Sequence, residues 1–347
     1  MIDLEQLPLA DEAHDRMFMD LWIQDFGACT LSAADEVSIF VALAEGARTP
    51  AELADLLRLE QRPLWAVCRA LVAMQALTTD GQSFALTPFA RSFWVKRTPL
   101  YRGREFDRHR FWEQHERIVA TLESGWAPID DDDKSFTEAW RDGNLSEESA
   151  GNFTRVMHSM ILTPSLAAVR SGAFASVRHL VDVGGGSGAL AATFLAHHPN
   201  ALASVMDLAA VCAASRQILS GVKSGGDVAY LPCNFFEDPW PTDADGFCFS
   251  NILHDWPVDT CRGLLRRAFE ALAPGGRVFV HEALLAPDRC SPRMTALFSL
   301  LMLMNHRGQQ FTCDELFELL RDAGFEAPRV VHSYSYWSVV EASKPVG

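Results

Sequence analysis

The chain has no surplus of positive charge. Its 347 residues include 30 Lys and Arg against 45 Asp and Glu, so the formal net charge is −15. A surface with this balance repels a phosphate backbone along most of its area. We therefore expect no nucleic-acid partner.

Hydrophobic targeting segments are also missing. No apolar run reaches the roughly 20 residues that a transmembrane helix needs, and the first residues lack the basic start and the apolar stretch of a signal peptide. None of the eight cysteines forms a C-x-x-C pair, so we expect reduced and mostly buried thiols. These absences predict a cytoplasmic protein with no membrane partner.

The N-terminal part has the pattern of a small helical domain. Residues 31–44 have the periodicity of an amphipathic helix, and residues 49–52 provide a capping threonine, a proline and an acidic first turn. Two helices are expected next, separated by a break near Arg62 and Pro63, with the second covering residues 64–77.

A turn at residues 79–82 and a β-type segment at 83–87 complete the outline of a winged helix. Such units often bind DNA, but Arg69 is the only basic residue on a second helix that is otherwise apolar. Packing against another chain fits this surface better.

From His179 onward, β-type and helical segments alternate, which predicts an open parallel α/β sheet. No helix joins the last two β-type segments, so the last strand should run antiparallel beside its predecessor. The expected strands cover residues 179–183, 202–206, 227–231, 246–252, 277–284, 327–333 and 336–342.

A glycine-rich turn at residues 181–188, Val-Asp-Val-Gly-Gly-Gly-Ser-Gly, follows the first of these strands. Glycines there let a ligand touch the backbone. Because Ala189 comes next, the run satisfies both the dinucleotide-binding pattern and the pattern of enzymes that bind S-adenosylmethionine. Asp207 ends the next strand, where an acid can accept both ribose hydroxyls, and Asn234 with Phe235 offers an amide and an aromatic face to an adenine ring.

Five features together resemble the caffeate and antibiotic O-methyltransferase family of S-adenosylmethionine-dependent small-molecule enzymes. The five features are the N-terminal winged helix and residues 181–188, 206–208, 251–256 and 273–277. The match covers nearly the whole chain, and its motifs come in the family's order.

The resemblance implies a fold, a domain plan and a homodimer. The fold would be α/β, a Rossmann-like seven-stranded methyltransferase sheet with an antiparallel last strand plus a winged-helix domain. Residues 1–100 would form the dimerisation domain, residues 101–172 a helical connector that lines the substrate pocket, and residues 173–347 the catalytic domain that binds S-adenosylmethionine. A small-molecule substrate would lie between domains.

The resemblance also assigns the cofactor site residue by residue. Asp182, Gly184 and Gly186 would lie near the methionine part, Asp207 at the ribose, and Asn234 and Phe235 at the adenine, with Asn234 in place of the family's usual Asp. Ser250 stands where many plant members have Lys, and Met157 and Met160 fall where the family lines the substrate pocket.

The catalytic residues of the family are only partly present. His254 would be the general base, and Glu282 matches the first of the two glutamates that hold it. Gln310 occupies the place of the second glutamate, and His306 comes just before it. The gain of a histidine beside the lost glutamate suggests another chemistry.

Two imidazoles and a carboxylate form a metal-binding triad with open positions. His254, Asp255 and His306 are the candidates, and iron or zinc is the expected metal ion. This set resembles the branch of the family that methylates carbon 3 of 2-oxo acids, where a chelated metal stabilises the enolate. We therefore expect carbon methylation, with phenolic O-methylation by His254 as general base as the alternative.

Two alternatives of other classes stay open. A nicotinamide-dependent oxidoreductase would explain the glycine turn, and a DNA-binding regulator would explain the winged helix. The antiparallel last strand disfavours the first, and the acidic charge disfavours the second. One arginine of a cluster could hold a substrate carboxylate. The cluster comprises Arg102, Arg104, Arg108 and Arg110.

Overall fold

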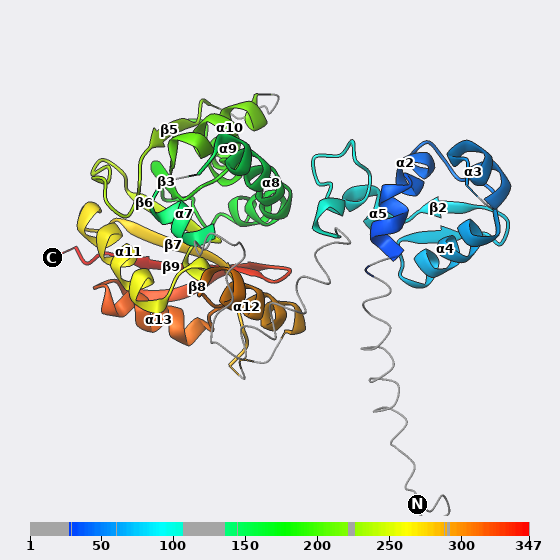
Figure 1. Ribbon diagram of the computed structural model, residues 1–347. Coiled ribbons are helices and arrows are strands. Elements are labelled where there is room, and N and C mark those ends of the chain that lie inside the picture. Colours follow the sequence, from blue (N-terminus) through cyan, green and yellow to red (C-terminus); the bar gives the residue numbers. More distant parts are fainter. Residues whose placement is uncertain are drawn as a thin grey trace, which may run out of the picture. The chain divides into compact units, whose positions relative to one another are not determined.

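The computed structural model describes residues 28, 30–59, 61–106, 136–143, 145–220, 226–287, 289 and 292–346. The chain divides into two compact units, Met1–Glu113 and Gln114–Gly347 (Figure 1). Within the described ranges, no helix has the length and apolar character that a membrane crossing requires. Of the arginine cluster, Arg102 forms an ion pair with Glu105 at 2.7 Å, while Arg108 and Arg110 lie outside the described residues.

The N-terminal unit packs short helices around a two-stranded antiparallel sheet with its own buried core. Its elements are α2 (Ile39–Ala44), α3 (Pro50–Leu57), α4 (Gln61–Ala73), β1 (Leu77–Thr79), β2 (Phe84–Leu86), α5 (Pro88–Phe93) and η1 (Gly103–Phe106). The predicted cap of α3 is present, because the Glu52 N–H donates to the Thr49 hydroxyl at 3.3 Å and the Thr49 N–H donates to the Glu52 carboxylate at 2.8 Å.

The helix boundaries in this unit differ from the prediction at two places. The expected helix over residues 31–44 is interrupted at Ser38, whose φ is 68°. The break between the next two helices lies at Arg58, with φ 56°, and Pro63 falls inside the first turn of α4. Proline is tolerated there because its missing N–H has no partner in a first turn.

The C-terminal unit is a seven-stranded sheet of order β5-β4-β3-β6-β7-β9-β8. The strands from β5 to β7 are parallel, and β9 runs antiparallel to both of its neighbours, β7 and β8. This confirms the predicted fold class and the antiparallel last strand. Its elements are α7 (Phe136–Arg141), α8 (Glu147–Arg170), β3 (His179–Val183), α9 (Ala189–His197), β4 (Leu202–Asp207), α10 (Ala209–Leu219), β5 (Ala229–Pro232), β6 (Gly246–Ser250), η2 (Leu253–Asp255), α11 (Val258–Ala271), β7 (Arg277–Ala283), α12 (Arg293–His306), α13 (Cys313–Asp322), β8 (Glu326–Tyr334) and β9 (Trp337–Ser343).

Both faces of the central strands are covered by helices. Helices α11 and α13 lie on one side of the sheet, and α8 and α9 lie on the other (Figure 1). Alternate residues of β3 and β6 pack against α11 and α13, and the residues between them pack against α8 and α9. The strands read as continuous apolar runs because they are buried on both faces. Parallel β3 to β7 therefore all end at one edge of the sheet, where α/β proteins bind their ligands.

Candidate functional site

The glycine turn after β3 leaves room for a ligand against its backbone. Gly184, Gly186 and Gly188 all have positive φ, at 65°, 54° and 77°. The φ of Gly184 favours glycine, and a Cβ there would lie 2.5 Å from Cδ1 of Ile252 and force that side chain to shift. A Cβ at Gly186 would meet nothing closer than 4.0 Å, so the space above this residue is open.

Two buried carboxylates flank this turn. Asp207 ends β4, and its two oxygens accept the N–H groups of Leu208 at 2.7 Å and Gly186 at 3.0 Å, while the Trp140 indole donates to the same carboxylate. Asp182 lies in β3, and its buried Oδ1 has no hydrogen-bond partner among the residues that the structure describes. Burial and the Asp207 charge raise the pKa of Asp182 to about 8, and burial raises the pKa of Asp207 to about 6. A cationic ligand placed beside them would stabilise both negative charges.

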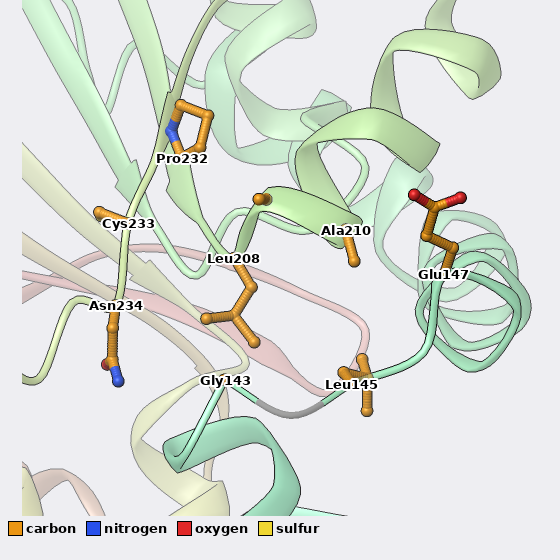
Figure 2. Close-up of a pocket in the computed structure, with 9 residues that line it drawn as sticks. Gly143, Leu145, Glu147, Leu208, Ala210, Pro232, Cys233 and Asn234 are labelled. Carbon is orange, nitrogen blue, oxygen red and sulfur yellow. The ribbon is translucent and has the colours of Figure 1, made fainter.

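A cavity of about 530 Å³ opens beside the ends of β4 and β5 (Figure 2). Leu208 and Asn234 come from these strand ends and face the connection from α7 to α8. Asn234 donates to the Arg141 carbonyl at 2.8 Å and accepts the Phe236 N–H at 3.0 Å. The described lining residues are Gly143, Leu145, Glu147, Leu208, Ala209, Ala210, Pro232, Cys233 and Asn234.

Of the residues that the sequence assigned to the cofactor, Asn234 is among the described lining residues of this cavity. Phe235 and Ser250 have other surroundings. Phe235 is 3% exposed and belongs to the core, and the Trp240 indole donates to its carbonyl at 2.9 Å. The Ser250 hydroxyl is 3.0 Å from Nδ1 of His281, whose pKa burial lowers to about 3. His281 is therefore a neutral partner of Ser250 at the end of β6.

His254 is held by a carboxylate that the backbone itself fixes. Oε1 of Glu282 accepts the N–H groups of Ile252 and Leu253 at 3.0 Å each and that of His254 at 3.4 Å. Oε2 of Glu282 lies 2.8 Å from Nδ1 of His254. Because Glu282 is fully buried and bound to the η2 turn by these N–H groups, the imidazole that it contacts has a fixed orientation.

Further groups complete the surroundings of this imidazole. The Gln310 side-chain amide lies 2.9 Å from Nδ1, and the Phe298 ring packs edge-on with its centroid 5.3 Å away. Burial lowers the pKa of His254, but the Glu282 and Asp255 charges and the hydrogen bonds outweigh it and raise the pKa to about 9. A Cβ at Gly308 would overlap the His254 carbonyl oxygen, so only glycine fits there.

The three predicted metal ligands lie near one another. Oδ1 of Asp255 is 3.4 Å from Nε2 of His254 and 3.9 Å from Nε2 of His306. Nevertheless, the part of the chain that the structure describes contains no group of three or more His, Cys, Asp or Glu side chains that could hold a metal ion. With its pKa raised, the His254 ring would also have to lose a proton before ligating a metal. The metal site therefore has no support in the structure, and we derive no step through it.

Helix α8 connects the predicted substrate residues to the glycine turn. Met157 and Met160 are half-buried on α8, and Nδ1 of His158, between them, lies 2.8 Å from the Ser187 hydroxyl. The sequence pattern singled out neither His158 nor Trp140. No local signal marks them, because each contacts a residue that is distant in the sequence.

Comparison with known proteins extends this description. The model of the O-methyltransferase domain family matches residues 133–326. A 3-hydroxy-5-methyl-1-naphthoate 3-O-methyltransferase of Streptomyces sahachiroi is 32% identical over 87% of each chain, and a 2,7-dihydroxy-5-methyl-1-naphthoate 7-O-methyltransferase of Streptomyces carzinostaticus is 31% identical over 90% of this chain and 92% of the relative. The structure of human N-acetylserotonin methyltransferase in complex with SAM superposes with a TM-score of 0.82 at 23% identity, covering 98% of this chain and all of that one.

Proposed function

Because the chain belongs to the O-methyltransferase family and is an S-adenosylmethionine-dependent methyltransferase, we propose that it methylates a phenolic hydroxyl of a fused-ring aromatic acid, with His254 as general base. Two relatives that match most of the chain are named for methylation of hydroxyls on naphthoate rings. They support a phenolic oxygen as the acceptor. Neither is named for transfer to carbon, so carbon 3 of a 2-oxo acid becomes the alternative outcome.

The edge of the sheet fits the cofactor. When bound, S-adenosylmethionine supplies a methyl group on a positively charged sulfur. Asp207 would accept the ribose hydroxyls, Asn234 would face the adenine, and the open backbone at Gly186 would admit the methionine part. Asp182, with its buried unpartnered oxygen, offers negative charge to the cationic end.

The observation that carries the catalytic assignment is the Glu282 carboxylate that holds Nδ1 of His254. Because the pKa of His254 is raised to about 9, the ring must first release the Nε2 proton to solvent. With the remaining ring N–H directed to Glu282, Nε2 is the nitrogen that takes the phenolic proton. The charge that then forms on the imidazole lies between Glu282 and Asp255, whose Oδ1 is 3.4 Å from Nε2. Gln310 stands in place of the family's second glutamate and carries no charge. Asp255 thereby provides the second negative charge beside His254.

Positioning of the acceptor supplies the rest of the rate enhancement. When the acceptor oxygen is held in line with the methyl group of the cofactor, the transfer proceeds like an intramolecular reaction. Half-buried Met157 and Met160 offer adaptable apolar contacts for such an acceptor. We further propose that residues 1–100 form the dimer contact and that residues 101–172 line the substrate pocket, as the family resemblance implies.

A product analysis tests the proposal. The purified protein is incubated with S-adenosylmethionine and either a hydroxynaphthoate, the same naphthoate without its hydroxyl, or an aromatic 2-oxo acid, each with and without a metal chelator. We expect one methyl group on the hydroxynaphthoate oxygen, indifferent to chelator, and no reaction of the other two. Carbon methylation of the 2-oxo acid that is lost with chelator would overturn the proposal in favour of the metal-enolate reaction.

A further inference from the structure

Asn251 joins β6 to the η2 turn in a backbone conformation that is uncommon outside glycine. Its φ is 55°, in the left-handed region, which asparagine adopts more readily than most other residues. Its N–H still donates to the His281 carbonyl at 3.0 Å, which continues the pairing of β6 with β7. The chain therefore follows β7 up to residue 251 and changes direction there.

This change of direction brings three successive N–H groups to one side of the chain. In a strand, successive N–H groups point in opposite directions. A left-handed residue followed by a right-handed one turns them toward a common point, where an anion fits. Ile252, with φ −119° and ψ −48°, is that right-handed residue. Oε1 of Glu282 occupies the point and accepts the N–H groups of residues 252, 253 and 254. The conformation of Asn251 thus sets the position of the Glu282 carboxylate.

The Asn251 side chain is held by a residue of β9. Its Oδ1 accepts the Trp337 indole N–H at 2.9 Å, and both residues are buried. Trp337 pairs in register with Ala283, the residue after Glu282. Strand β9 therefore contacts both the strand that carries Glu282 and the residue that shapes the turn around its carboxylate.

We propose that Asn251 and Trp337 are positioning residues for His254. Their hydrogen bond holds residue 251 in the left-handed conformation, and this conformation directs the η2 N–H groups onto Oε1 of Glu282. Oε2 of the same carboxylate is thereby kept 2.8 Å from Nδ1 of His254. The pair acts on the reaction through Glu282. The inference rests on the proposed function, because it requires His254 to be the base.

Single-turnover methyl transfer by Trp337→Phe tests this pair. The substitution keeps an aromatic ring and removes the indole donor. We expect the rate constant at saturating cofactor and hydroxynaphthoate to fall about tenfold because the base is misaligned, while the Kd of S-adenosylhomocysteine stays within about twofold.

Trp240→Phe is the matched control. Trp240 is 8% exposed against 7% for Trp337, and its indole also donates at 2.9 Å, to the Phe235 carbonyl. The control should lose a similar amount of thermal stability and keep the wild-type rate constant. Equal rate constants for Trp337→Phe and Trp240→Phe refute the proposal.

Two variants of Asn251 test the conformation itself. Asn251→Ala and Asn251→Gly both remove the acceptor, but only glycine adopts a positive φ without strain. We expect both to be slower than the wild type and the glycine variant to be at least about threefold faster than the alanine variant. Equal rate constants for these two variants contradict the assigned role. The same comparison decides the question should Trp337→Phe fail to fold.

The proposed function and the positioning pair fail in different ways. If the wild type methylates no hydroxynaphthoate, or if Glu282→Gln reacts at the wild-type rate, the proposed function is wrong. If Glu282→Gln is slow but Trp337→Phe behaves like its control, only the positioning pair is wrong. The ring nitrogen signals of His254 in isotope-labelled protein provide a readout that needs no substrate. We expect Trp337→Phe to shift these signals and Trp240→Phe to leave them in place, and signals that stay in place in both variants overturn the positioning role.

Discussion

Replacing Glu282 by glutamine tests the assigned role of His254 most directly. The side chain keeps its length, so its oxygen can still accept the N–H groups of Ile252, Leu253 and His254. Its amide nitrogen would then face Nδ1 of His254 in place of a carboxylate oxygen at 2.8 Å. An amide N–H requires Nδ1 to be an acceptor, which moves the ring proton to Nε2, the nitrogen that must be free to act as base.

The size of the effect follows from charge and tautomer together. Two unit charges about 4 Å apart interact by about 4 kcal/mol at an effective dielectric constant of 20, or about 3 pKa units. Loss of the Glu282 charge therefore takes the pKa of His254 from about 9 to about 6, further below the pKa of about 10 of a phenol. In an assay above about pH 9, where the ring is neutral in both proteins, kcat falls about 30-fold if half of this difference is felt in the transition state, and the wrong tautomer extends the loss to about 10³-fold.

The assay is single-turnover methyl transfer from labelled S-adenosylmethionine to a hydroxynaphthoate, accompanied by the Kd of S-adenosylhomocysteine and by the thermal unfolding temperature. We expect the Kd to stay within about twofold, because no cofactor residue changes. A second variant that adds Gln310→Glu to Glu282→Gln returns a carboxylate to the same ring nitrogen and should recover at least about tenfold. A folded Glu282→Gln protein with kcat near wild type would refute the reasoning.

Three other changes have definite expected outcomes. Asp207→Asn should raise the Kd of S-adenosylhomocysteine by about tenfold or more, because it removes a charged acceptor of the ribose hydroxyls, and calorimetry that shows no change contradicts this assignment. Because the pKa of Asp182 is raised to about 8 from its ordinary 3.8, the folded protein binds this proton more tightly than the unfolded chain does. The free energy of unfolding of the free protein should therefore fall between about pH 4 and pH 8, whereas affinity for the cationic cofactor should rise by up to about tenfold per pH unit toward pH 8. Asp182→Asn should reduce the slope of both trends, and the raised pKa values of Asp207, about 6, and His254, about 9, leave a residual slope. Slopes equal to those of the wild type exclude Asp182 as a source. Thr49→Ala should destabilise the N-terminal unit by about 1 kcal/mol through loss of the α3 cap, as measured by chemical denaturation, with Thr78→Ala at an exposed position of β1 as a threonine control.

The sheet could be predicted from the sequence because its signals are local. A strand such as β6 is a short apolar run between glycine and serine, and this pattern is typical of a strand that is buried on both faces. The helix break was placed wrongly at Pro63 because proline has opposite meanings inside a helix and in its first turn. The sequence does not show where a first turn begins when no capping residue marks it.

The site was harder to predict because its contacts are distant in sequence. The residues at strand ends could be placed at one edge, and the structure does bring Asp255 close to both His254 and His306. The expected proximity of these residues does not distinguish a metal site from an ion pair. The distinction depends on the exact distances between the side chains and on the proton that Glu282 stabilises on His254. The hydrogen bond by which Trp140 lowers the pKa of Asp207 had no signal in the sequence, because the two residues are far apart in the chain.

The place of β9 in the sheet has a consequence for biosynthesis. β9 lies between β7 and β8, although both of these strands precede it in the chain. During translation, β7 and β8 therefore emerge with facing edges that stay bare until residues 337–343 arrive, and such edges invite pairing with other chains. β7 also carries Glu282, which pairs in register with Ser338 of β9. A nascent chain that is arrested before β9 is synthesised would thus expose unpaired strand edges next to Glu282. We therefore expect arrest at this point to cause more aggregation than arrest within the N-terminal unit.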